Sequence, residues 1–102
     1  MISGSIFQVM PVNEIPRESI DTSGHSKYIC KSCGREQFLY DQTDMLRVQR
    51  DALNDNCDMY VTPRMWGEGQ AFGRFVISGR FYRLLKDNSL TRSMGFAPVR
   101  VY

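Results

Sequence analysis

The pair of cysteines Cys30 and Cys33 is the feature of this chain that is best suited to chemistry. The two residues form a C-x-x-C motif, and Gly34 follows directly after the second cysteine. This short spacing lets both thiolates reach one zinc ion, at about 2.3 Å from each sulfur. Glycine can turn the backbone where a Cβ would clash, so that neighbouring N–H groups approach the sulfurs. The motif therefore predicts half of a tetrahedral zinc site.

Two further residues could complete the site. His25 is the only histidine of the chain, and Cys57 is its only other cysteine. With Cys30 and Cys33 they would form a Cys3His set, which would be structural because four protein ligands leave no open position for catalysis. We expect Cys57 to be a ligand in preference to His25, and we expect one zinc ion per chain.

Alternatives to this site stay open. His25 lies in a polar loop and could be an ordinary surface residue, and Cys57 could be a small buried side chain. The pair Cys30 and Cys33 could be a metal-free knuckle that is kept for its turn geometry. Redox chemistry is the least favoured reading, because a thioredoxin-like C-x-x-C stands at the start of a helix in a βαβ unit.

The glycine-rich loop from Trp66 to Gly73 is a second candidate site. Its glycine spacing fits neither the dinucleotide fingerprint nor the phosphate-binding P-loop. It does contain the only tryptophan of the chain, with Arg64 before it and Arg74 after it. Tryptophan and arginine are common anchors of protein interfaces. We therefore expect Arg64, Trp66 and Arg74 to contact a partner; the alternative is that Trp66 packs in the core.

Composition narrows the classes of function. An enzyme is not expected, because one histidine would have to serve every acid–base scheme and the acidic residues show no paired pattern. The net charge of +2 is too small to imply a polyanionic partner. Three cysteines, an odd number, argue against a secreted disulfide framework. No signal peptide and no apolar run of ~18 residues is evident, so we expect no membrane span and a cytoplasmic location.

The elements that must position these residues are predicted from periodicity and capping signals. Ser78 is a good N-cap for a helix that would end near residue 87. A further helix is predicted to begin in 41–44 and run through residue 53, because apolar residues there recur at helical spacing. Strands are predicted at 6–10, 28–29, 37–40, 58–62, 74–77 and 96–102.

These elements predict an α+β fold. With 102 residues, the chain is expected to form one domain. It would contain a zinc-knuckle-like hairpin, a short mixed or antiparallel sheet, and one or two helices. The knuckle region would cover about 25–57, and a strand–helix–strand unit would cover about 74–102.

Two stretches of the chain resemble a known family. The sequence Cys30-Lys31-Ser32-Cys33-Gly34 resembles the first motif of the double-CXXCG proteins, which are associated with bacterial polymorphic-toxin immunity. The tail, from Phe75 to Val99, resembles the C-terminal unit of such immunity proteins: a strand, a serine-capped helix and a "PV" strand. The second CXXCG of that family has no counterpart here.

The resemblance implies a non-catalytic protein that binds and blocks a bacterial toxin domain. Our leading hypothesis is therefore a small cytoplasmic binding protein with a zinc knuckle, in the role of an immunity protein. The alternative is a zinc-ribbon module that binds nucleic acid or takes part in transcription. Salt dependence separates the two hypotheses, because contacts to phosphates release counterions and weaken steeply with salt.

Overall fold

The computed structural model describes residues 8–39, 45–67, 70–92 and 94–102. These residues form a small domain with one α-helix and six short strands, which agrees with the α+β expectation in its coarse form. The α-helix is α1 (Gly79–Asp87), and two 3-10 turns are η1 (Arg17–Ser19) and η2 (Arg50–Ala52). The strands are β1 (Lys27–Ile29), β2 (Glu36–Phe38), β3 (Arg47–Val48), β4 (Met59–Val61), β5 (Phe75–Ile77) and β6 (Arg100–Val101).

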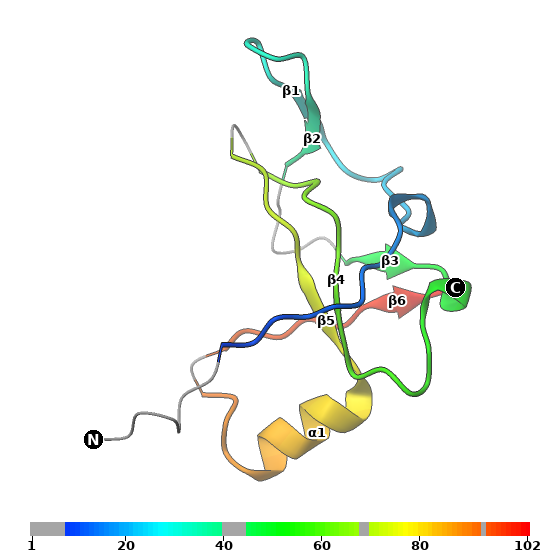
Figure 1. Cartoon of the computed structure of the whole chain (residues 1–102), viewed down its shortest axis with the longest axis vertical. Coiled ribbons are helices and arrows are strands. Elements are labelled where there is room, and N and C mark those ends of the chain that lie inside the picture. Colours follow the sequence, from blue (N-terminus) through cyan, green and yellow to red (C-terminus); the bar gives the residue numbers. More distant parts are fainter. Residues whose placement is uncertain (1–7, 40–44, 68–69, 93) are drawn as a thin grey trace.

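The strands pair as three two-stranded sheets. β1 and β2 are antiparallel, β4 and β5 are antiparallel, and β3 and β6 are parallel. The hairpin of β1 and β2 stands at one end of the molecule and α1 lies at the other end, with β3 and β6 between them (Figure 1). An isolated two-stranded sheet is at best marginally stable in water, so these sheets depend on a shared core.

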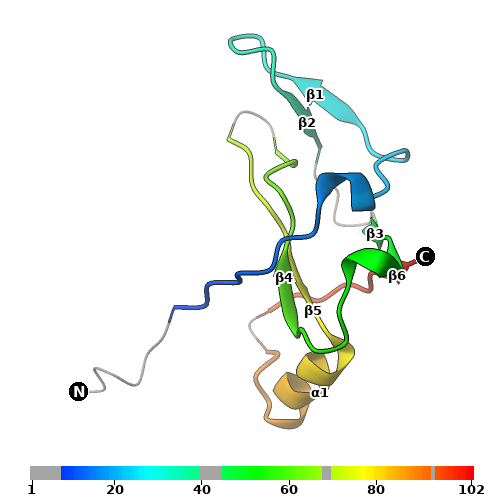
Figure 2. The same cartoon turned by 45° about the vertical axis from the view of Figure 1, so that its right-hand side comes forward.

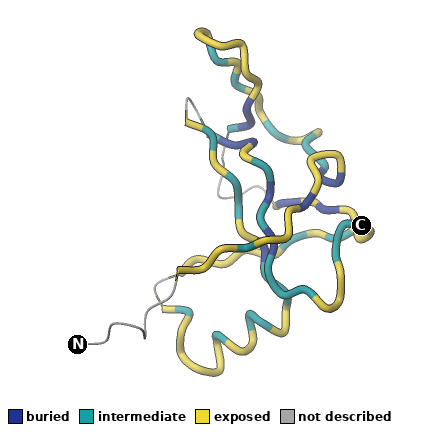
Figure 3. Tube along the Cα trace, in the orientation of Figure 1, coloured by how far each residue is buried: buried dark blue, intermediate teal, exposed yellow. Residues whose placement is uncertain are grey.

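All three sheets contribute to that core. Phe38 comes from β2, Val48 from β3, and Tyr60 from β4, and each of these side chains is buried. The other buried hydrophobic residues are Ile15, Ile20, Leu46, Met65, Trp66 and Val76. Buried segments gather in the middle of the molecule, whereas the tip of the hairpin and most of α1 are exposed (Figure 3).

The helix predicted to run through residue 53 is wrong. Its first residues, 41–44, lie outside the described residues, and the rest forms β3 and η2. Exposure alternates over 45–48: Met45 and Arg47 are exposed, whereas Leu46 and Val48 are buried. This period of two is typical of a strand. Pairing with β6 decides the conformation, because Arg100 N–H donates to the Leu46 carbonyl at 2.8 Å.

The predictions for the middle and the end of the chain are largely confirmed. The hairpin strands, β4 and β5 lie within or next to the predicted ranges, and α1 begins directly after Ser78. The last strand is shorter than predicted, because only β6 is paired within 96–102. Residues 6 and 7 of the strand predicted at 6–10 lie outside the described residues, and residues 8–10 have no regular structure.

The first turn of α1 is tied to the loop that precedes β4. The Ser78 hydroxyl accepts the Phe81 N–H at 3.1 Å and donates to the Asp58 carboxylate at 2.7 Å. Arg80 pairs with the same carboxylate. Hydrogen bonds from Arg80 and Ser78 hold the pKa of Asp58 below its usual value.

The apolar face of α1 is less buried than its spacing predicts. Phe81 and Leu85 are half-buried, Leu84 is 59% exposed, and no residue of the helix is fully buried. The helix therefore covers the domain incompletely, and apolar surface is left between α1 and its neighbours.

We predict that Ser78→Ala destabilises the domain by about 1 kcal/mol, because the Phe81 N–H loses its cap and Asp58 loses a donor. Urea denaturation followed by circular dichroism measures the change. Ser26→Ala is the matched control, since Ser26 is exposed and accepts the Leu39 N–H through its backbone carbonyl. Equal unfolding midpoints for the two variants would contradict the role of the cap.

Candidate functional site

The C-x-x-C motif forms the turn between β1 and β2. Cys30 N–H donates to the Arg35 carbonyl at 2.9 Å, and Gly34 N–H donates to the Cys30 carbonyl at 2.8 Å. Gly34 has a φ of +73°, a value that favours glycine over residues with a Cβ. The glycine after the second cysteine therefore closes the turn, as its position in the motif predicts.

The two thiols lie side by side in this turn. Hydrogen bonds lower the pKa of the Cys30 thiol, first from the backbone N–H and the thiol of Cys33, and then from the Ser32 N–H. Donors of this kind stabilise a thiolate, which is the form that binds metal. The residues present therefore fit half of a zinc site.

Polar contacts fix the hairpin of β1 and β2. The Lys27 ammonium pairs with the Glu36 carboxylate at 2.8 Å across β1 and β2. The Arg35 guanidinium donates to the Arg64 carbonyl at 3.4 Å, which links the turn to the segment that precedes Trp66. These contacts orient the turn while its outer surface stays exposed.

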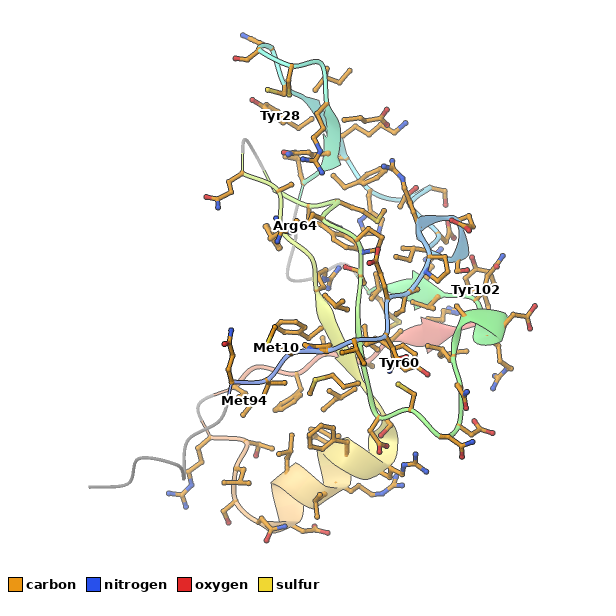
Figure 4. All side chains as sticks on the ribbon, viewed as in Figure 1. Met10, Tyr28, Tyr60, Arg64, Met94 and Tyr102 are labelled. Atoms are coloured by element: carbon orange, nitrogen blue, oxygen red, sulfur yellow. The ribbon has the colours of Figure 1, made fainter. Side chains whose placement is uncertain are left out.

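Cys57 is part of a different local structure. Its thiol donates to the Met59 carbonyl at 3.2 Å and accepts the Asn13 side-chain amide at 3.1 Å. It lies in the loop before β4, where the Tyr60 hydroxyl bonds the backbone of Asn54. Figure 4 shows Tyr28 on the hairpin and Tyr60 far from it.

His25 lies between the hairpin and the core. It is half-buried, and its ring centroid is 6.0 Å from that of Phe38 and 6.4 Å from that of Trp66. Within the ranges that the structure describes, no group of three or more His, Cys, Asp and Glu residues could hold a metal. The structure thus brings Cys30 and Cys33 together, and it groups neither His25 nor Cys57 with them as ligands.

Trp66 is not at the surface, so the expectation that its indole contacts a partner is wrong for the free chain. The side chain is 0% exposed, and its backbone pairs with Phe38 and with Phe72. Burying so large an apolar ring stabilises the fold more than an exposed position would. The core-packing alternative therefore holds.

The two arginines predicted to flank the indole differ in position. The Arg74 guanidinium lies 5.1 Å from the Trp66 ring centroid and is half-buried. Arg64 is exposed and points away from the middle of the molecule (Figure 4). Arg74 thus packs against Trp66. Of the three residues expected to contact a partner, Arg64, Trp66 and Arg74, only Arg64 exposes its side chain to solvent.

A groove that the sequence did not predict lies beside β5. It has a volume of 680 Å³ and is lined by β5, the start of α1, residues 95–99 and the side chains of Leu53, Tyr82 and Val101. Phe75 on its wall is 69% exposed. Among its described lining residues there is no acid and no basic side chain. The sequence signal for it is the apolar final segment, which the residue pattern predicts as a strand at 96–102.

One edge of β5 is open along this groove. Its ladder to β4 continues through Thr62 N–H to the Arg74 carbonyl and Ser78 N–H to the Asp58 carbonyl, both at 2.9 Å. The backbone N–H and C=O groups of Val76 therefore point toward β4, and those of Phe75 and Ile77 point outward. In the described part of the chain these outward groups have no hydrogen-bond partner.

Comparison with known protein families, curated proteins and solved structures finds no match for this chain. Among the described residues, no helix has the length and apolar character needed to cross a membrane. The hairpin and the groove are therefore the features of the molecule that point to a function.

We predict that Trp66→Ala lowers the free energy of unfolding by roughly 3–5 kcal/mol, because it leaves a large cavity in the core. Urea denaturation measures the loss, and Trp66→Phe gives a smaller loss if Trp66→Ala does not fold. Arg64→Ala is the matched surface control, with a change within about 0.5 kcal/mol. A folded wild-type chain whose tryptophan emission resembles that of free indole in water would contradict the burial of Trp66.

Proposed function

We propose that this chain is a non-enzymatic binding protein with two working parts. The groove beside β5 binds an extended segment of a protein partner, and the hairpin of β1 and β2 carries zinc. The observation that carries the proposal is the open edge of β5 next to an apolar groove of 680 Å³.

The open edge specifies the conformation of the bound segment. The outward N–H and C=O groups of Phe75 and Ile77 match the hydrogen-bonding pattern of a neighbouring strand. A peptide that adds as a strand satisfies these groups, and its alternate side chains enter the groove. Exposed strand edges readily pair with other chains, so an open edge beside an apolar surface is a natural binding site.

The uncharged lining of the groove indicates which kind of segment would bind there. Its described lining residues are apolar or neutral, including Phe96 and Pro98. A charged occupant would lose its hydration there without gaining a partner of opposite charge. The favoured occupant is therefore an uncharged segment with apolar alternate side chains.

The resemblance to the immunity proteins of bacterial polymorphic toxins supports a more specific form of this proposal. In that form the partner is a toxin domain, and binding blocks its action. Its test is protection of cells that express such a domain together with this chain. The alternative function, binding of nucleic acid, would require affinity for DNA or RNA that falls steeply with salt.

We predict that Phe75→Lys lowers affinity for a groove-binding peptide at least tenfold, because a charge enters an apolar interface. Peptides selected from a displayed random library against the whole chain are the probe, and calorimetry measures affinity. Val12→Lys is the matched control, since Val12 is 89% exposed and does not line the groove.

Hydrogen exchange on the same complex locates the peptide. We expect exchange of the Phe75 and Ile77 amides to slow when the peptide binds, because their N–H groups gain acceptors. Three outcomes would contradict the proposal: equal affinity of the two lysine variants, slowed exchange only elsewhere, or self-association through this edge in place of peptide binding.

We predict that the purified chain binds zinc through Cys30 and Cys33. Metal analysis after purification without chelator measures the zinc, and Cys33→Ser is expected to lose it. Cys57→Ser is the matched control and is expected to keep it, because the Cys57 thiol is bonded to Met59 and Asn13. A reduced wild-type chain that takes up no added zinc would exclude metal binding at the hairpin.

A further inference from the structure

The hairpin supplies two thiols to a metal that needs more ligands. Structural zinc sites have four protein ligands in tetrahedral arrangement. In the described ranges, Cys30 and Cys33 form no group with a third candidate ligand. The thiol of Cys57, the only other cysteine, is bonded to Met59 and Asn13.

The position of the turn allows the missing ligands to come from outside the chain. Both views show the hairpin extending away from the rest of the molecule (Figure 1 and Figure 2). Residues 31–36, which surround the thiols, are all exposed. A second hairpin of the same kind could therefore approach this tip along a two-fold axis and present an identical pair of thiols, as isologous contacts do.

Charge at the tip fits such an arrangement. A zinc ion held by four thiolates carries a net charge of −2, because the ion contributes +2 and the thiolates −4. Lys31 and Arg35 stand in the turn of each hairpin, where the Arg35 guanidinium also donates to the Arg64 carbonyl at 3.4 Å, and the nearby Glu36 is paired with Lys27 at 2.8 Å. Two tips would surround the dianionic centre with cations. Without the metal, the same cations would repel one another.

We propose that two copies of this chain share one zinc ion, which is held by Cys30 and Cys33 of each copy. The inference rests on zinc binding by the hairpin and adds the identity of the remaining ligands. Formation of the site converts four thiols to thiolates: one Zn²⁺ binds, four protons leave for solvent, and no electron is transferred. Zinc is thereby the link that makes the chain a dimer.

Sedimentation velocity of the full chain, with zinc titrated under reducing conditions, tests the proposal. The metal-free chain is expected to be a monomer, and dimer formation is expected to saturate at one zinc per two chains. A chelator should reverse the association. Cobalt in place of zinc should give the absorption of a tetrahedral thiolate site at the same ratio of metal to chain.

Matched variants distinguish the contribution of the hairpin tip to dimer formation from that of the rest of the molecule. Cys33→Ser should remove both the dimer and the cobalt spectrum, whereas Cys57→Ser should keep both. Reversal of the tip charges in the double variant Lys31→Glu and Arg35→Glu should raise the zinc concentration needed for dimer formation roughly tenfold or more, because the cations no longer neutralise the centre.

The outcomes distinguish this inference from the zinc binding on which it rests. One zinc per chain in a monomer would overturn the shared site and leave zinc binding by the hairpin intact. A dimer that forms without metal, or that survives Cys33→Ser, would overturn the zinc link. Absence of any metal uptake would overturn both proposals.

Discussion

Burial of the Trp66 ring is the interaction on which the rest of this structure depends. The segment around Trp66 pairs on one side with Phe38, where Phe38 N–H donates to the Met65 carbonyl at 2.6 Å. On the other side Trp66 exchanges hydrogen bonds with Phe72. The ring thus lies where the hairpin of β1 and β2 joins the rest of the domain. Three sheets of two strands each have little stability alone, so a large apolar ring that they share has a strong effect on the whole.

This arrangement separates the stable part of the molecule from the parts available for binding. The hairpin is anchored at its base through Phe38, which is buried, while its turn remains exposed. At the other end, α1 is attached through Ser78 and Asp58 but leaves apolar surface beside β5. A small domain has few apolar residues, and when most of them join the three sheets, few remain to cover α1.

The two candidate sites differ in how far sequence could reveal them. C-x-x-C followed by glycine is a local pattern: a turn of few residues fixes where both sulfurs lie, and the structure places Cys30 and Cys33 together. The groove is formed where β5 and the start of α1 meet Leu53 and residues 95–99. The apolar residues of α1 have the spacing of a buried helix face, so periodicity alone could not distinguish Leu84, which is exposed and lies outside the groove, from a core residue.

Local signals in the sequence determined the elements that local physics controls. Ser78 predicted the start of α1 because its hydroxyl accepts an N–H three residues ahead, and the strands beside the cysteines followed from their residue types. Only the tertiary structure decided that 45–48 is a strand, since its pairing partner, β6, lies more than half the chain away in sequence. It also decided that Trp66 is buried and that Cys57 is bonded elsewhere. Burial and ligand grouping depend on which distant segments meet, and no short pattern of residues carries that information.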